Sequence, residues 1–135
     1  MINRAIRELL PNQGWRMAHP QPTNAEEFAA RFEIQTGFDE NQDATFSSDP
    51  NDFGITWDQV QAKVSEIEAG LPIELLRDVR NGMIAETDWT QAPDSPLDAA
   101  DKSAWQNYRQ ALRDITQTYT SLDDVVWPTK PGEEV

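Results

Sequence analysis

The stretch that decides the fold is Asp98–Thr116, with the sequence DAADKSAWQNYRQALRDIT. Its large apolar side chains recur at the spacing of one helix face: Trp105, Tyr108, Leu112 and Ile115. Asp98 is a favourable N-cap residue, and Asp101 three positions later completes a partial capping box. The stretch therefore predicts an amphipathic helix that buries an aromatic stripe.

Two short helices are predicted in the first third of the chain. Residues 3–10 have helical periodicity, which Pro11 ends. Thr23 or Asn24 is a suitable cap for a second helix, because Glu27 then lies in its first turn, where negative charge suits the helix dipole.

Two further helices are predicted on either side of Gly70. Thr56 and Gln59 form a capping box ahead of apolar residues at helical spacing. Gly70 is typical of a helix end. Pro72 is tolerated in a first turn, so we expect a new helix to begin near it and to run past Met83.

The remaining segments predict extended or irregular structure. Residues 32–36 and 44–47 alternate with a period of two around a polar connection, which indicates a small β-hairpin. Trp15–Ala18 is expected to be a short extended piece. Prolines exclude regular helix from residues 87–97, and we expect an extended tail from Thr118 onward.

These segments together define the expected fold class. It is mainly α with a small β-hairpin, hence α+β, and it comprises short helices, a carboxy-terminal helical hairpin and an extended proline-containing tail. The 135 residues have the size of one ordinary domain. Because only 38% are hydrophobic and the mean hydropathy is -0.69, we expect a modest core with polar stretches around it.

The charge balance limits the classes of partner. The formal net charge is -13, with 24 acidic residues against 11 Lys and Arg. Such a chain is repelled by nucleic-acid backbone and by anionic membranes, so neither is expected as a partner. No apolar run is long enough to cross a bilayer, and the amino terminus is too short and polar for a signal peptide. We expect the chain to stay inside the cell in which it is made, unless a particle carries it out.

The residues that usually carry chemistry give no constellation. There is no cysteine, and His19, the one histidine, lies in a proline-rich turn. Residues 39–43 superficially resemble a calcium loop but lack its glycine and its final glutamate. Asp123 and Asp124 are adjacent carboxylates on the tail, which is weak support for a cation site. We therefore predict no catalytic residue, no metal, no cofactor and no enzymatic activity.

Two runs between residues 80 and 131 are more specific than the rest of the chain. They are Thr87–Gln91, with the sequence TDWTQ, and Tyr108–Asp114, with the sequence YRQALRD. A proline-rich turn separates them, and Trp127–Pro131 follows with the sequence WPTKP. In this order and at this spacing the segment resembles the phage tail assembly chaperone family.

The resemblance divides the chain into two regions. Residues 80–135 form the chaperone-like region, whereas residues 1–79 match no family that we can name and are expected to be a variable, partner-specific part. Within the chaperone-like region, Ala92 stands where the family often has a bulky apolar residue, and residues 117–121 lack the usual prolines and glycines.

Each motif residue has a structural and a binding interpretation. Trp105 and Leu112 are expected in the core of the helical hairpin. Arg109 and Arg113 are expected away from that stripe, paired with Asp88, Asp94 or Asp114. Alternatively, an arginine or a tryptophan grips a tail or fibre subunit, since both are common interface anchors. The candidate partner-binding or motif residues are Arg80, Asp88, Trp89, Trp105, Tyr108, Arg109, Arg113, Asp114, Trp127 and Pro128.

The resemblance implies a function by protein binding, in the host cytoplasm during assembly or in the virion tail. The first hypothesis is a phage tail or tail-fibre assembly protein that binds tail, tail-fibre or baseplate proteins without catalysis. The alternative is a permanent small subunit of the virion tail, fibre or baseplate, present in multiple copies. Low hydrophobicity and the proline-rich tail suit a chain that neighbours keep ordered.

Overall fold

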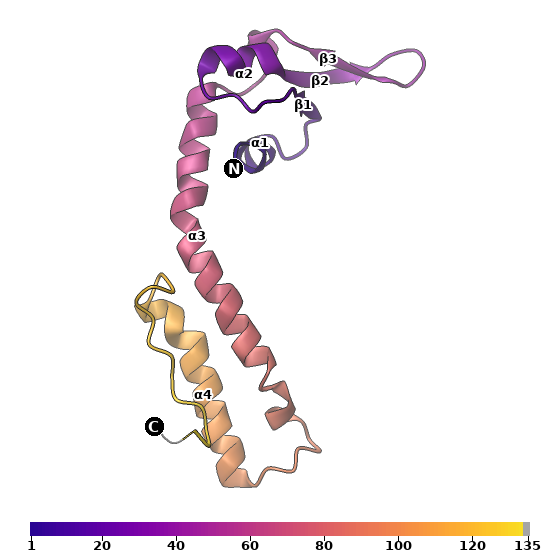
Figure 1. Ribbon diagram of the computed structural model, residues 1–135. Helices are drawn as coiled ribbons and strands as arrows, with labels where there is room; N and C mark the ends of the chain where they lie inside the picture. The colour runs from indigo at the N-terminus through magenta and orange to yellow at the C-terminus, as the bar shows by residue number, and fades with distance from the viewer. Residues whose placement is uncertain (134–135) are drawn as a thin grey trace. The chain divides into compact units, whose positions relative to one another are not determined.

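A computed structural model describes residues 1–133. The chain forms two compact units, Met1–Ala69 and a second that begins at Gly70. In chain order the elements are α1 (Ile2–Leu9), β1 (Trp15–Met17), α2 (Ala25–Arg31), β2 (Phe32–Phe38), β3 (Ala44–Ser47), the 3-10 helix η1 (Pro50–Asp52), α3 (Trp57–Ala85), the 3-10 helix η2 (Asp88–Gln91) and α4 (Ala99–Thr118), as Figure 1 shows. The α+β class is confirmed.

The predicted helix caps are present. The side chain of Asn24 accepts a hydrogen bond from the backbone of Glu27 at the start of α2. Thr56 and Gln59 exchange two hydrogen bonds, of 2.8 and 3.2 Å, as a capping box requires. Asp98 begins α4 by accepting from the third residue of its first turn at 2.8 Å. These bonds satisfy backbone N–H groups that have no partner within the helix.

The predicted helix end at Gly70 and helix start at Pro72 are wrong, because α3 continues from Trp57 to Ala85. Gly70 is not among the glycines with positive φ, so it does not adopt the left-handed conformation that ends helices. Pro72 removes one backbone donor, which would have bonded the carbonyl of Glu68. Pro72 and Glu68 are exposed and Gly70 is half-buried, so water can reach that carbonyl. The unit boundary between Ala69 and Gly70 falls inside α3.

The predicted hairpin is the centre of a three-stranded antiparallel sheet. Its order is β1-β2-β3, and Trp15–Met17, expected only as an extended piece, supplies the third strand. The register between β2 and β3 shifts between Gln35 and Gly37, which leaves Thr36 as an extra residue on β2. Figure 1 shows the hairpin of β2 and β3 projecting beyond α2.

An aromatic cluster forms the core of the first unit. Phe28 of α2 stacks on Phe32 with ring centroids 4.9 Å apart, and Phe53 meets Phe32 edge-on at 4.8 Å. Such pairs add to the stabilisation from buried area. The other buried members of this core are Ala5, Ile6, Ile34, Ile55, Val60 and Ile67.

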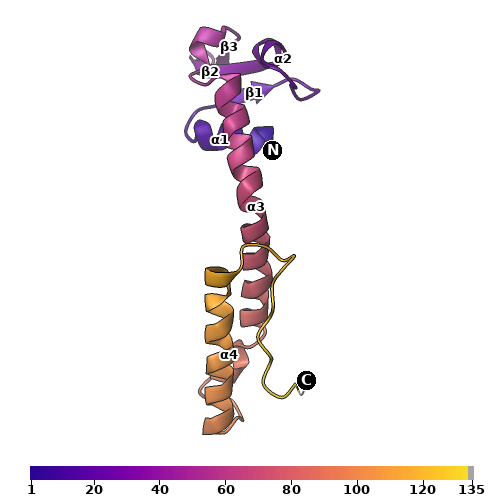
Figure 2. The same ribbon diagram turned by 90° about the vertical axis from the view of Figure 1, so that its left-hand side faces the viewer.

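The second unit is built on the predicted helical hairpin. Figures 1 and 2 both show α4 running antiparallel beside the carboxy-terminal part of α3. Trp105, Tyr108 and Leu112 are buried there, as the stripe predicted. The side chains packed against them are Met83, Ile84, Leu97 and Trp127. After α4 the described tail, residues 119–133, has turns but no helix or strand.

Candidate functional site: an arginine-held turn with an exposed tryptophan

Arg109 joins α4 to the last turn of α3 and to the segment that follows it. Its Nη1 atom donates to the carbonyl of Ile84 at 2.9 Å and to the hydroxyl of Thr87 at 2.7 Å. The same atom lies 2.8 Å from the Asp88 carboxylate. Arg109 is only 8% exposed. The predicted pair of Arg109 with Asp88 therefore exists, but through one nitrogen rather than as a bidentate fork.

The prediction that Arg109 lies away from the aromatic stripe is wrong. Trp105 and Arg109 are four residues apart in α4, so they lie on the same helix face. Arg109 is buried there beside Tyr108 and Leu112. A buried guanidinium needs hydrogen-bond acceptors, and the end of α3 and the turn after it supply them.

The TDWTQ segment, residues 87–91, is held by its own side chains as well. The hydroxyl of Thr87 donates to the carbonyl of Ile84 at 2.7 Å. The hydroxyl of Thr90 donates to the carbonyl of Thr87 at 2.6 Å and accepts from Gln91 at 2.9 Å. Thr87 and Thr90 are 2% and 0% exposed. Together with Arg109, these bonds fix the geometry of η2.

Trp89, at the middle of this fixed turn, is 51% exposed. Its ring lies 6.1 Å from the ring of Trp105, which in turn meets Tyr108 edge-on at 5.8 Å. The Nζ atom of Lys130 lies 5.9 Å from the Trp105 ring, within reach of a cation–π contact. The turn therefore presents half of a large indole to solvent while its supporting side chains are buried.

Residues 73–132 match the sequence model of the phage tail assembly chaperone protein family. This segment belongs to the phage tail assembly chaperone family. The match covers all of the TDWTQ turn, α4 and Trp127, and it supports a role in phage tail assembly.

Other comparisons add one structural relative. Protein CV0426 from Chromobacterium violaceum, known from a solution structure, is 30% identical over 66% of this chain and 89% of its own, with a TM-score of 0.39. No curated protein matches the chain.

The other predicted residues of the chaperone segment do not all meet at the turn. Arg80 donates to the carbonyl of Arg113 at 3.4 Å, and so joins α3 to α4 away from Asp88. Asp114 accepts from Gln110 and Gln117 on its own helix, so it pairs with neither arginine. Within residues 1–133 the Arg113 side chain makes no ion pair.

The last predicted residues of the chaperone segment lie in its tail. Trp127 is half-buried against the core formed by Trp105, Tyr108 and Leu112. Pro128, which follows it, is also partly exposed. Of the predicted set, the structure brings together Asp88, Trp89, Trp105, Tyr108, Arg109 and Trp127 around the turn and its supporting core.

Thr87 and Thr90 lie in the TDWTQ run noted in the sequence, but neither was predicted as a site residue. Their spacing of three, with a tryptophan between them, places both hydroxyls on the inner side of a 3-10 turn. Threonine hydroxyls often bond to nearby backbone carbonyls, so this spacing was a usable signal.

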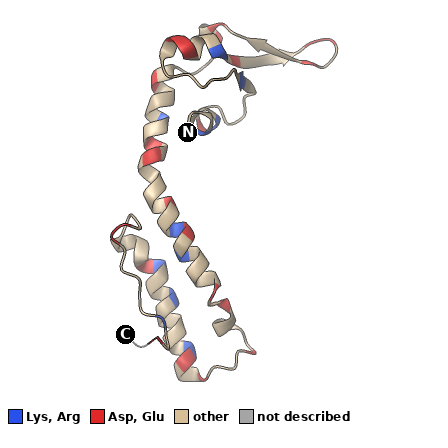
Figure 3. Ribbon diagram, viewed as in Figure 1, with Lys and Arg blue, Asp and Glu red and all other residues tan. Residues whose placement is uncertain are grey.

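One ionisable group in the core of the chaperone segment has a shifted pKa. Burial raises the pKa of the Tyr108 phenol above its ordinary value, and the nearby carboxylates of Glu133 and Glu86 act in the same direction. Tyr108 therefore stays neutral near pH 7. Figure 3 shows acidic residues along the connection between α3 and α4, which includes Asp88 and Asp94.

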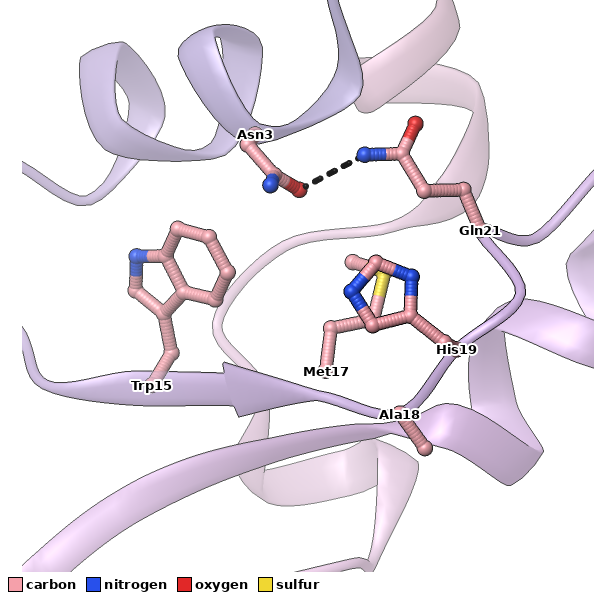
Figure 4. A pocket seen from close by; sticks show the side chains of 6 residues that line it. All are labelled: Asn3, Trp15, Met17, Ala18, His19 and Gln21. Carbon is pink, nitrogen blue, oxygen red and sulfur yellow. Dashed lines mark hydrogen bonds between the residues drawn. The ribbon is translucent and has the colours of Figure 1, made fainter.

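A small cavity lies within the first unit. It measures about 60 Å³ and is lined by Asn3, Trp15, Met17, Ala18, His19 and Gln21 (Figure 4). Asn3 and Gln21 are joined across it by a hydrogen bond of 3.2 Å. Small-molecule sites usually exceed about 300 Å³. The cavity is therefore too small for most ligands.

Among residues 1–133 no three His, Asp or Glu side chains gather closely enough to hold a metal ion. In that same part of the chain, no helix combines the length and apolarity needed to span a membrane.

Proposed function

We propose that this chain acts in phage tail assembly by binding a tail, tail-fibre or baseplate protein, with no catalysis and no cofactor. The family match of residues 73–132 supports the assembly role. The single observation that carries the binding proposal is the exposed indole of Trp89 on a turn fixed by buried side chains.

A fixed tryptophan is well suited to binding. Association costs free energy wherever a side chain or loop must be ordered, and a turn that is already ordered avoids much of that cost. Arg109 and the hydroxyl of Thr87 hold the backbone that leads into η2. Tryptophan is also among the residues most often found at the energetic centre of interfaces. Trp89 is therefore the proposed anchor.

The surroundings of Trp89 select a positively charged partner. The side chain of Asp88 is 65% exposed, although one of its oxygens faces Arg109. A lysine or arginine of the partner could pair with that carboxylate and lie on the Trp89 ring. The net charge of -13 would speed the approach of a basic surface. The proposed partner surface is thus basic, with an apolar recess for the indole.

A co-purification experiment tests this proposal. Tagged full-length chain is expressed with the tail, tail-fibre and baseplate proteins of the same phage, and mass spectrometry identifies what is retained. We expect one of these proteins to be retained by the wild type and by Leu75→Ala, whose residue is 56% exposed in the same unit, but not by Trp89→Ala. Retention of none of them by the wild type would contradict the proposal.

Mass spectrometry of purified mature particles separates a transient factor from a permanent subunit. Absence of the chain from particles is the expected result for an assembly factor. Its presence in a fixed ratio to other tail proteins would instead establish a permanent virion subunit.

A further inference from the structure

The hairpin of the first unit leaves one edge of the sheet open. Because the strand order is β1-β2-β3, strand β3 lies at an edge. Within the described residues no further strand pairs with it. An open edge exposes backbone donors and acceptors that another extended chain can bond.

The hydrogen bonds show which residues of β3 face outward. The N–H of Asp39 donates to the carbonyl of Asp43 at 2.9 Å, so this pair is bonded across the hairpin. Bonded and non-bonded pairs alternate in antiparallel strands, so the backbone groups of Ala44 and Phe46 point away from β2. Gln35 lies opposite Phe46, and its N–H donates to the carbonyl of Gly14 at 2.8 Å, on the other side of β2. Gln35 and Phe46 are therefore a non-bonded pair, as the alternation requires.

The side chains of β3 do not protect this edge against pairing. Strand β3 has the sequence ATFS, with no charged residue and no proline, which are common devices that blunt exposed edges. Phe38, the partner of Ala44 in the register, is 66% exposed. Phe46 lies on the same face of the sheet, with the Arg16 guanidinium 4.2 Å from its ring centroid. The edge is therefore both open and partly apolar.

Acidic residues flank the edge at both ends. Asp39, Glu40 and Asp43 precede β3, and Asp49 and Asp52 follow it, with no lysine or arginine from residue 39 to residue 52. Figure 3 shows the acidic tip of the hairpin. A second copy of β3 pairing antiparallel would set these carboxylates against one another, which is unfavourable. A positively charged strand added at this edge would instead meet acidic residues at both of its ends.

We propose that β3 binds an extended, positively charged segment of a partner protein, which adds to the sheet as a fourth strand through the backbone groups of Ala44 and Phe46. This site lies outside the family match at residues 73–132 and does not depend on Trp89. Two separate surfaces would allow the chain to hold two segments at once.

Amide hydrogen exchange of the full chain, followed by NMR, tests the proposal. The probe is a synthetic peptide of alternating lysine and valine. In the free chain we expect fast exchange at Ala44 and Phe46 and slow exchange at Thr45 and Ser47. Saturating peptide should slow exchange at Ala44 and Phe46 by about tenfold or more. Slow exchange at both in the free chain, or no effect of the peptide, would overturn the proposal.

Matched variants and probes identify the contact. Ala44→Pro removes an outward N–H from the first residue of an edge strand, where proline is tolerated, and should abolish peptide binding. Ala44→Val keeps that N–H and should bind as the wild type does. Glu40→Gln combined with Asp43→Asn should weaken binding about 2- to 5-fold. Equal binding by Ala44→Pro and wild type would refute strand addition.

One control needs no variant of the protein. The same peptide, methylated on alternate backbone nitrogens, cannot complete the hydrogen-bond ladder and should not bind. Equal binding of the methylated peptide, or of a glutamate–valine peptide, would show a different mode of contact and would also refute the proposal.

Discussion

The Nη1 atom of Arg109 lies 2.8 Å from the carboxylate of Asp88, yet the two side chains are 10% and 65% exposed. An ion pair with one exposed member contributes little to stability, because water competes for its charge. The bonds from Arg109 to Thr87 and to the carbonyl of Ile84 are shielded from water. The stabilising effect of Arg109 therefore resides in these bonds more than in the ion pair.

We predict that Arg109→Ala lowers the unfolding free energy of the second unit by about 2–3 kcal/mol, because it leaves the buried Thr87 hydroxyl and the Ile84 carbonyl without this donor. Asp88→Asn should cost less than about 1 kcal/mol. Chemical denaturation followed by tryptophan fluorescence measures both. Equal losses for the two variants would show that the ion pair is the main contribution.

The two neighbouring tryptophans should differ in their effect on stability. Trp105 is 9% exposed and lies in the core of the second unit, so Trp105→Ala should cost about 3–5 kcal/mol. Trp89 is 51% exposed, and Trp89→Ala should cost about 1 kcal/mol or less. Melting curves of the two variants give the comparison. A larger loss for Trp89→Ala would mean that its indole serves the fold.

Local signals in the sequence predicted much of this fold. Thr56 and Gln59 are sufficient to mark a helix start, because a capping box involves residues only three positions apart. The stripe of Trp105, Tyr108 and Leu112 likewise predicted the buried face of α4. The resemblance suggested a division of the chain between residues 79 and 80, and that division stays a prediction. The two compact units of the structure divide at a different place, between Ala69 and Gly70.

Other features depended on contacts that no local pattern contains. Gly70 and Pro72 resemble a helix end, but the flanking turns of α3 continue through them. Trp15–Met17 is too short to predict a strand, and it becomes one only by pairing with β2. The burial of Arg109 was partly predictable from its spacing to Trp105, whereas its acceptors lie more than twenty residues earlier in the chain.

Two glycines should respond in opposite ways to replacement by alanine. Gly82 lies inside α3, and a Cβ atom there would meet nothing within 4 Å. Gly82→Ala should therefore raise stability by about 0.5–1 kcal/mol. Gly54 has φ +70, where side chains are strained, so Gly54→Ala should lower stability by about 1 kcal/mol. Thermal melts followed by circular dichroism test both signs.

Glu27, in the first turn of α2, should make the free energy of unfolding depend on pH in the acidic range. Hydrogen bonds from the backbone and hydroxyl of Thr23, aided by Arg31, hold the pKa of Glu27 below its ordinary value of 4.5. A lowered folded-state pKa contributes stability that is fully present above 4.5 and is lost as the pH falls through the folded-state pKa. The stability difference between wild type and Glu27→Gln should therefore be largest near pH 7 and shrink below pH 4.5.

Glu26→Gln is the control for that titration. Glu26 lies in the same first turn, but its carboxylate makes no hydrogen bond within residues 1–133. Its difference from wild type should be small at every pH. If the difference in unfolding free energy between wild type and Glu27→Gln stayed constant down to pH 3, the proposed stabilisation by the Glu27 carboxylate would be contradicted.

The affinity of the chain for its co-purified tail protein tests the binding role of Trp89 most directly. Isothermal titration calorimetry of wild type, Trp89→Ala and Leu75→Ala gives the three dissociation constants, and melting temperatures confirm that each chain is folded. We predict that Trp89→Ala weakens binding about 30-fold or more, which corresponds to a hot-spot loss of about 2 kcal/mol, while Leu75→Ala binds like the wild type. Unchanged affinity of folded Trp89→Ala would contradict the account.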